Sequence, residues 1–176
     1  LCYFEEGDYI LLQNEISSLG EIIKIARERG MKIILNPSPF DEHLDSCDLS
    51  AVDTFLLNEV EGEAVSGTSD PKRMADAILE QYPKSHVVLT LGKQGVLYKD
   101  ASHSASHGIF EMPVIDTTAA GDTFTGYYIA GMLEGQPVES ALRLASMAAA
   151  LAVSREGAAP SIPLRAEVDA ALEQQK

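Results

Sequence analysis

The chain has 176 residues, with 13 Lys and Arg against 27 Asp and Glu, which leaves a formal net charge of −14. A chain this acidic lacks the excess of basic residues that nucleic acids and anionic membranes attract, so we expect neither as a partner. The hydrophobic fraction of 45% and the length are ordinary for one globular domain, which we expect to span residues 1–176. No apolar run approaches the roughly 20 residues of a membrane-spanning helix. Two cysteines, Cys2 and Cys47, are too few for a disulfide framework, which favours a reducing, cytoplasmic location.

The first part of the chain alternates short apolar runs with amphipathic segments. Ser18 and Glu21 fit the capping box that begins a helix, and Gly30 fits its end. The pattern predicts helices at 17–29 and 71–82, strands at 9–13, 32–36, 54–57, 87–91 and 95–98, and an extended stretch at 109–115.

The last third of the chain changes character and favours helices at 121–133, 138–154 and 164–174. Strands that alternate with helices predict parallel βαβ units, with helices on both faces of the sheet. We therefore expect an α/β fold, a three-layer α-β-α sandwich with a mainly parallel sheet. Ligands of such sheets bind beyond the carboxyl ends of the strands, so we expect the functional residues just after each strand.

One such segment is Asp-Thr-Thr-Ala-Ala-Gly-Asp-Thr-Phe at 116–124. The small residues Ala119, Ala120 and Gly121 would leave backbone N–H groups open at a helix N-terminus, where the helix dipole favours an anion. Asp122 follows in the first turn, where it could take the proton of a hydroxyl that attacks a phosphoryl group. The alternative is a helix cap with tight helix–strand packing, and local physics favours neither.

Asn58 and Glu61 follow a predicted strand and would share one face of a helix. Together they could hold a hydrated Mg²⁺ that bridges phosphates. The alternative, favoured when the segment is considered alone, is a solvated acidic helix start with Asn58 as its N-cap.

A glycine-flanked turn follows the strand at 87–91. Its backbone donors and the Thr90 hydroxyl could approach a nucleotide, although a simple β-turn is the favoured interpretation in isolation. The residues of this turn are Thr90, Leu91, Gly92, Lys93, Gln94 and Gly95.

The segment at 116–124 resembles the C-terminal signature of the ribokinase-like (PfkB) sugar kinases. Further similarities occur in the order expected of this family: Leu-Leu-Gln-Asn-Glu at 11–15, Asn-Pro-Ser-Pro at 36–39, Asn-x-x-Glu at 58–61, Thr-Leu-Gly-x-x-Gly at 90–95, and Arg-Glu-Gly-Ala-Ala-Pro-Ser-Ile-Pro at 155–163. The double alanine before Gly121 and the last of these segments are typical of the ribokinase branch. The resemblance covers nearly the whole chain.

This resemblance implies ATP-dependent phosphorylation of the primary 5-hydroxyl of a sugar, D-ribose for the ribokinase branch, with Mg²⁺ and an activating K⁺. It makes Asp122 the general base and a sugar contact, with Glu15 as a second sugar contact. It assigns the anion hole to Ala119, Ala120 and Gly121. It implies a nucleotide site made by Asn58, Thr90, Leu91, Gly92, Lys93, Gln94, Gly95, Gly121 and Ser146, the last where the family often has His or Asn near adenine. It implies that Glu61 orders Mg²⁺ and its water, and that K⁺ is held by Asp116, Thr118, Ala152, Arg155, Gly157 and Ser161, mostly through backbone carbonyls.

The family's first third is not represented, including its Gly-Gly sugar motif and the β lid that forms the usual dimer interface. The chain also starts at Leu1 rather than Met, so we expect a piece of a longer, homodimeric protein. By itself it should bind Mg·ATP weakly and phosphorylate ribose negligibly. Two alternatives remain open: a related kinase with fructose, another sugar or a nucleoside as acceptor, and a nucleotide-binding fragment without turnover.

Overall fold

The computed structural model describes residues 3–175, with Asp45 described by its backbone alone. Cys2 lies outside the described residues, and Cys47 is a free, half-buried thiol. The chain divides into two compact units: Leu1–Gly92 with Leu97–Ser104, and Lys93–Val96 with Ala105–Lys176.

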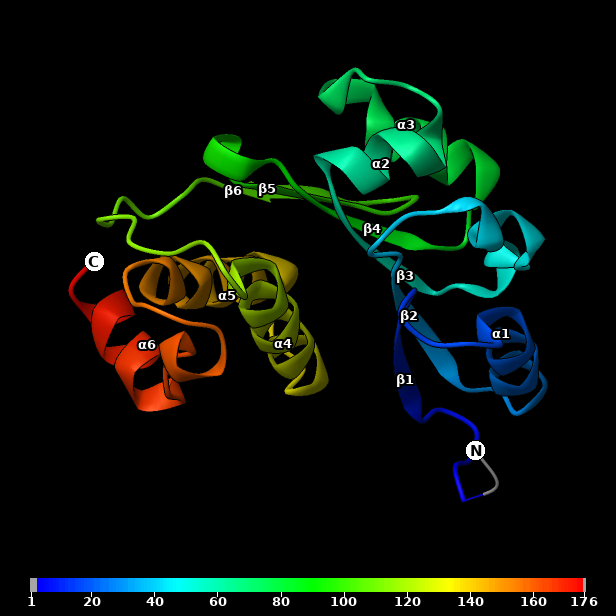
Figure 1. Cartoon of the computed structure of the whole chain (residues 1–176), viewed down its shortest axis with the longest axis horizontal. Coiled ribbons are helices and arrows are strands. Elements are labelled where there is room, and N and C mark those ends of the chain that lie inside the picture. The colour runs from blue at the N-terminus through cyan, green and yellow to red at the C-terminus, as the bar shows by residue number, and fades with distance from the viewer. Residues whose placement is uncertain (1–2, 176) are drawn as a thin grey trace. The chain divides into compact units, whose positions relative to one another are not determined.

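The strands form one six-stranded sheet whose spatial order is the order of the chain, β1-β2-β3-β4-β5-β6 (Figure 1). The first four strands are parallel, and their carboxyl ends lie at one edge: Gln13 is opposite Asn36, and Asn58 is opposite Thr90. This edge is where the sequence predicted functional residues. The strands are β1 (Tyr9–Gln13), β2 (Lys32–Asn36), β3 (Thr54–Asn58), β4 (His86–Thr90), β5 (Val96–Lys99) and β6 (Ser104–His107).

In the first unit, α1 (Leu19–Glu28), α2 (Glu59–Ser66) and α3 (Pro71–Gln81) connect the parallel strands and pack on one face of the sheet (Figure 1). Their apolar residues share a core with alternate strand residues, which include Ile33, Leu35, Phe55, Leu57, Val87 and Leu89. The residues between these along the strands, Ile34, Leu56 and Val88, are also buried, which agrees with the continuous apolar runs of parallel strands.

The second unit contains α4 (Ala120–Leu133), α5 (Val138–Val153) and α6 (Arg165–Glu173), which pack on one another in chain order. Gly131 permits a close approach of α4 to α5, because a Cβ at this position would lie 3.1 Å from Ala141 Cβ. The expectation that the helix at 138–154 is buried on most sides is confirmed, since Leu142, Ala145, Met147 and Ala148 are all fully buried. Short 3₁₀ turns occur at Glu42–Ser46, Leu49–Ala51, Gly92–Gln94 and Ala159–Ser161.

One expectation about local structure needs correction. The capping box at Ser18 is wrong: Ser18 has a left-handed φ of 64° and makes no side-chain cap, because its backbone turns too sharply for the extended N-cap geometry. The stretch at 109–115, expected to be extended, has no regular secondary structure, and the strand before it, β6, was not predicted because Ser-Ala-Ser-His carries little apolar signal. None of the helices in residues 3–175 has the length and apolar character needed to cross a bilayer.

Candidate active site

In the first unit, the carboxyl end of β3 continues directly into α2 through a reciprocal pair. The Asn58 side-chain oxygen accepts the amides of Val60 and Glu61 at 2.9 and 3.0 Å. In return, the Glu61 carboxylate accepts the Asn58 backbone N–H and the Asn58 side-chain amide, both at 2.9 Å. Asn58 is therefore the N-cap, as the alternative interpretation predicted. Glu61 is only 4% exposed, whereas Asn58, Glu59 and Val60 are exposed, so the helix start is solvated as that alternative expected except at Glu61.

Two residues of the turn after β4, Thr90 and Gly95, have structural roles. The Thr90 hydroxyl donates to the Leu57 carbonyl at 3.2 Å, which ties the ends of β3 and β4 together. Gly95 has a φ of +90°, and a Cβ there would lie 2.1 Å from the His107 carbonyl oxygen, so only glycine fits. Between these positions Leu91 is half-buried, whereas Gly92, Lys93 and Gln94 are exposed. The exposed part of the turn is what a ligand could reach.

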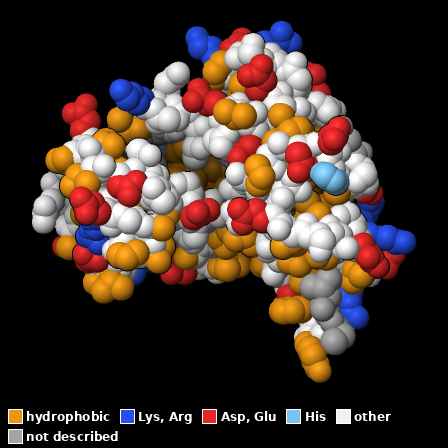
Figure 2. Space-filling model, viewed as in Figure 1, with side chains coloured by type: hydrophobic (Ala, Val, Ile, Leu, Met, Phe, Trp, Pro, Cys, Tyr) orange, Lys and Arg blue, Asp and Glu red, His pale blue; other side chains and the backbone are white. Residues whose placement is uncertain are grey.

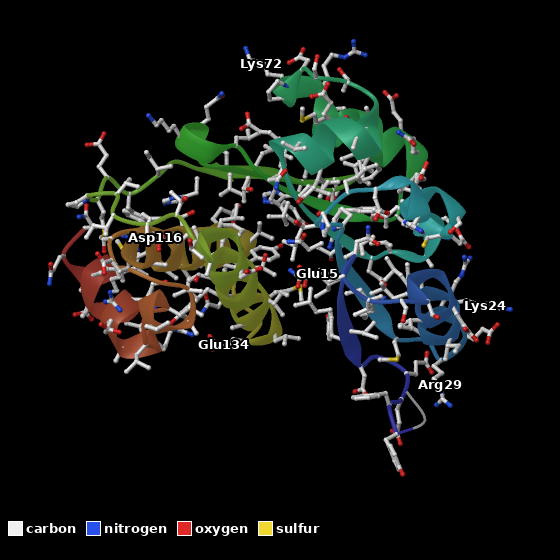
Figure 3. The ribbon with its side chains drawn as sticks, viewed as in Figure 1. Glu15, Lys24, Arg29, Lys72, Asp116 and Glu134 are labelled. Atoms are coloured by element: carbon white, nitrogen blue, oxygen red, sulfur yellow. The ribbon has the colours of Figure 1, made fainter. Side chains whose placement is uncertain are left out.

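Glu15 lies just after the carboxyl end of β1, and its side chain is exposed (Figure 3). Its neighbour Asn14 anchors this position, because the Asn14 side chain donates to the Pro39 carbonyl at 2.7 Å and its backbone N–H donates to the Ser38 carbonyl at 3.1 Å. The Asn-Pro-Ser-Pro turn thus holds the residue before Glu15 in place.

In the second unit, α4 starts without a side-chain cap. Ala119 occupies the N-cap position with a left-handed φ of 60°, and the helix begins with the bond from Thr123 N to Ala119 O at 2.8 Å. The first backbone N–H groups of a helix lack intrahelical acceptors, and the positive end of the helix dipole lies here. Of these groups, the Ala120 N–H donates to the Thr117 carbonyl at 3.3 Å, in the turn that leads into the helix. Asp122 lies exposed in this first turn, and apart from its chain neighbours and the backbone of α4, no described atom lies within 4 Å of where a Gly121 Cβ would be.

Thr123, the residue after Asp122, has an orphaned hydroxyl. Its side chain is 3% exposed, and among the described residues its Oγ1 has no hydrogen-bond partner. A helical side chain tilts toward the N-terminus of its helix, so this hydroxyl belongs to the same turn as the open N–H groups. A buried hydroxyl without a partner costs stability. Thr123 stands in the motif at 116–124, but nothing in the sequence marks its hydroxyl as unpaired.

Asp116 joins the segment before α4 to the segment after α5 (Figure 3). Its Oδ1 accepts the Thr118 amide at 2.9 Å, and its Oδ2 accepts the Gly157 amide at 3.0 Å. The bonds from Thr118 and Gly157 hold the pKa of the Asp116 carboxyl below its usual value. Behind Asp116, the amides of Ile115 and Asp116 both donate to the Val153 carbonyl, at 2.8 and 3.2 Å. Carboxylate, hydroxyl and carbonyl oxygens therefore gather around Asp116.

The remaining predicted K⁺ residues have mainly structural contacts. Ala152 is buried, and its carbonyl accepts the Arg155 amide at 3.1 Å. Ser161 is fully buried and donates to the Ala158 carbonyl at 2.7 Å. The Arg155 side chain turns to Glu167 of α6, a residue that the sequence analysis missed. Ser146 lies half-buried on α5.

A metal cluster of side chains is not found among the described residues. No group of three or more His, Cys, Asp or Glu side chains lies close enough to hold an ion there. Both Glu61 oxygens already accept from Asn58, so this carboxylate suits contact with a metal-bound water better than direct ligation.

Comparison with known proteins identifies the family. Residues 2–165 match the sequence pattern of the pfkB family carbohydrate kinases. The chain belongs to this family. The matched range includes every segment that resembles a motif of this family, from the β1 segment to the loop after α5.

Several relatives are ribokinases. The chain is 35% identical over 168 residues to a ribokinase of Haemophilus influenzae and 34% identical over 172 residues to one of Bacillus subtilis. These matches cover 92% and 94% of this chain but only 55% of each relative. The chain thus spans about half the length of these relatives.

Solved structures agree on the fold. A ribokinase from Thermotoga maritima matches with a TM-score of 0.80 and 32% identity, over 94% of this chain and 57% of that one. The Arabidopsis thaliana ribokinase, solved as a complex with ribose and ATP, matches with a TM-score of 0.80 and 30% identity, over 94% of this chain and 55% of that one. The chain therefore has the α/β sandwich fold of the ribokinases, as the sequence predicted.

Proposed function

We propose that this chain is the nucleotide-binding and catalytic part of an ATP-dependent sugar kinase, and that the acceptor is the primary 5-hydroxyl of D-ribose. Membership of the pfkB family and the ribokinase relatives support the reaction class and the acceptor. The Arabidopsis relative, which holds ribose and ATP, supports the pair of substrates.

The single observation that carries the proposal is the start of α4. It combines open backbone donors, the exposed carboxylate of Asp122, and the orphaned Thr123 hydroxyl within one turn. In the proposed reaction, Asp122 accepts the proton of the sugar hydroxyl while that oxygen bonds to the γ-phosphorus and the bond from phosphorus to the ADP oxygen breaks. The N–H groups at Ala119, Ala120 and Gly121 stabilise the negative charge on the phosphoryl oxygens.

The other residues have supporting roles in this proposal. Asn58, Ser146 and the exposed part of the 90–95 turn border the nucleotide, and Glu15 contacts the sugar. When bound, Mg²⁺ would neutralise phosphate charge. Glu61 would orient a water of that ion, since its own oxygens are engaged by Asn58.

A monovalent cation fits the oxygen-rich surroundings of Asp116, because K⁺ is held by carbonyl and carboxylate oxygens. Asp116, Thr118 and the backbone carbonyls of Ala152, Arg155 and Gly157 would hold it, with Ser161 closing the loop. When bound, K⁺ would fix the field and geometry beside the anion site. The bond between Asp116 and Gly157 supports this proposal.

We also propose that residues 1–176 act as one domain, and that the longer protein is a cytoplasmic homodimer. The free thiol of Cys47 supports the location. Apart from a second copy of the protein, the proposed partners are the sugar and ATP. Acidic side chains are spread among scattered Lys and Arg on the face shown in Figure 2.

A chimera tests the function. In it, this chain replaces the aligned part of the Haemophilus influenzae ribokinase. ADP release would be measured with D-ribose, 2-deoxyribose, fructose and adenosine, and D-ribose should be the best acceptor. Asp122→Asn should lower turnover by about 10²–10⁴-fold while ATP still binds. Near-normal turnover of D122N, or a clear preference for another acceptor, would contradict the proposal.

A further inference from the structure

The segment between α5 and α6, residues 154–163, is held from three sides by its own unit, and we call it the 154–163 loop. Gly157 N donates to Asp116 Oδ2 at 3.0 Å, and the Tyr127 hydroxyl on α4 donates to the Pro163 carbonyl at 2.6 Å. Arg155 donates from its two terminal nitrogens to both oxygens of Glu167 on α6, at 2.7 and 3.4 Å. These bonds from α4, α6 and Asp116 hold the loop in one defined conformation.

Glu167 has two tasks at the start of α6. Its Oε2 accepts the Leu164 amide at 2.7 Å, which caps the helix, and the same carboxylate receives Arg155. The two side chains are 43% and 32% exposed, and ion pairs this exposed add little to global stability. The Arg155–Glu167 ion pair is therefore better suited to holding the 154–163 loop in place than to stabilising the whole fold.

The bonds continue from this pair to the start of α4. Arg155 is two residues before Gly157, whose amide binds Asp116, and the other oxygen of Asp116 binds the Thr118 amide at 2.9 Å. Thr118 directly precedes Ala119, whose left-handed backbone starts α4. A continuous path of contacts thus joins α6 to the turn that carries Asp122.

We propose that Glu167 is a positioning residue, which holds Arg155 so that the Gly157 amide stays on Asp116 and the segment before α4 keeps its shape. Its effect on nucleotide binding rests on the function proposed above. Glu167 touches no substrate in this proposal. The other acidic residue near the start of α6, Asp169, accepts Arg165 Nε at 3.0 Å and does not contact the loop, which makes it a matched control.

The first experiment measures amide hydrogen exchange by NMR in the 176-residue chain. Glu167→Gln keeps an oxygen for the Leu164 amide but removes the charge that binds Arg155. Exchange of the Gly157 and Thr118 amides should rise about two- to fivefold in E167Q and in R155K, the range expected for loss of an exposed ion pair. It should not change in D169N, and the denaturant midpoints of E167Q and D169N should be similar. Unchanged exchange in E167Q, or an equal rise in D169N, would overturn the proposal.

The second experiment is calorimetric titration of the same variants with Mg·ATP. E167Q should bind about two- to fivefold more weakly than the unmodified chain and D169N equally well. If the unmodified chain binds no Mg·ATP but E167Q still speeds the exchange of Gly157, the proposed function fails and the positioning role stands. If Mg·ATP binds but exchange and affinity are the same in E167Q, the positioning role fails and the function stands.

Discussion

Asp116 and Gly157 are 41 positions apart in the sequence, yet the carboxylate of one accepts the amide of the other at 3.0 Å. This contact joins the loop before α4 to the loop after α5, near the N-terminus of α4. At the opposite end of α4, Glu134 pairs with Arg165 at 2.9 Å, so the ends of this helix have different partners (Figure 3). The resemblance implied that Asp116 and Gly157 share a K⁺ site; the bond shows that the two residues lie together, and the cation stays a prediction.

The first prediction concerns K⁺. Replacing Na⁺ with K⁺ should raise turnover of the chimera, because a cation among these oxygens would fix the loops on both sides of Asp116. Asp116→Ala should abolish this rise by removing the carboxylate from the centre of the group. Turnover would be measured in both salts at equal ionic strength, with D169N as a control that keeps the response. Turnover of the unmodified chimera that is indifferent to K⁺ would remove the basis for the site.

The second prediction concerns Thr123. Thr123→Val removes a buried hydroxyl that has no partner among the described residues and keeps the shape of the side chain. The free energy of unfolding of the 176-residue chain should therefore increase by about 1 kcal/mol, since an unsatisfied buried polar group costs roughly 1–3 kcal/mol. Urea unfolding measures this difference.

Thr123→Ser is the matched control, because it keeps the hydroxyl and loses only a methyl group. It should lower the free energy of unfolding by about 0.8 kcal/mol. If the hydroxyl serves a phosphate oxygen, T123V should also weaken Mg·ATP binding while T123S should not. A T123V chain less stable than the unmodified one would show that the hydroxyl has a partner in solution.

Much of the fold was predictable because it depends on short-range patterns. Apolar runs of five residues placed β1 and β2 at their observed bounds, and Pro71 placed the start of α3. The strand β6 was missed, because Ser104–His107 contains one buried apolar residue, Ala105, and pairs through its backbone. The Ser18 cap failed for a similar reason, since a left-handed φ at serine has no signature in the sequence.

The candidate site divides in the same way. The capping box of Asn58 and Glu61 is local, so spacing alone could indicate it. The role of Glu167 depends on a partner 12 positions away across a loop, and no periodic pattern marks such a pair. The orphaned state of Thr123 depends on packing from all sides, which only coordinates reveal.

The third prediction concerns pH. Partial burial alone would raise the pKa of Asp100, but hydrogen bonds from Tyr98, Ser102 and His103 outweigh it and hold the pKa well below its usual value. A depressed carboxyl pKa adds stability above the unfolded-state pKa of about 3.9, and this stability is lost as pH falls through the folded-state value. The unmodified chain should therefore be more stable than D100N at pH 7, and the difference should shrink steadily below about pH 4. Urea midpoints between pH 2 and 7 would measure it, and a constant difference across that range would contradict the prediction.

The fourth prediction concerns the 176-residue chain by itself. It contains the residues proposed to bind the nucleotide, but Glu15 and Asp122 are its only residues with a proposed contact to the sugar. Phosphoryl transfer requires the acceptor to be held in line, and loss of that positioning can cost several kcal/mol of barrier. The chain should therefore bind Mg·ATP weakly and phosphorylate ribose negligibly, whereas the chimera should turn over.

The edge strand β1 leads to a related prediction for the same chain. β1 is the end strand of the sheet order, and its Tyr9 and Leu11 side chains are 45% and 47% exposed. Edge strands with exposed apolar side chains pair with other chains, so light scattering should show concentration-dependent association. Leu11→Lys should reduce this association, because charge on an edge strand opposes pairing.

Calorimetry of Mg·ATP binding and a coupled ADP-release assay, each on the 176-residue chain and on the chimera, test the fourth prediction. Full turnover by the isolated chain would show that the sugar is held by residues within 1–176 that the proposal leaves unassigned.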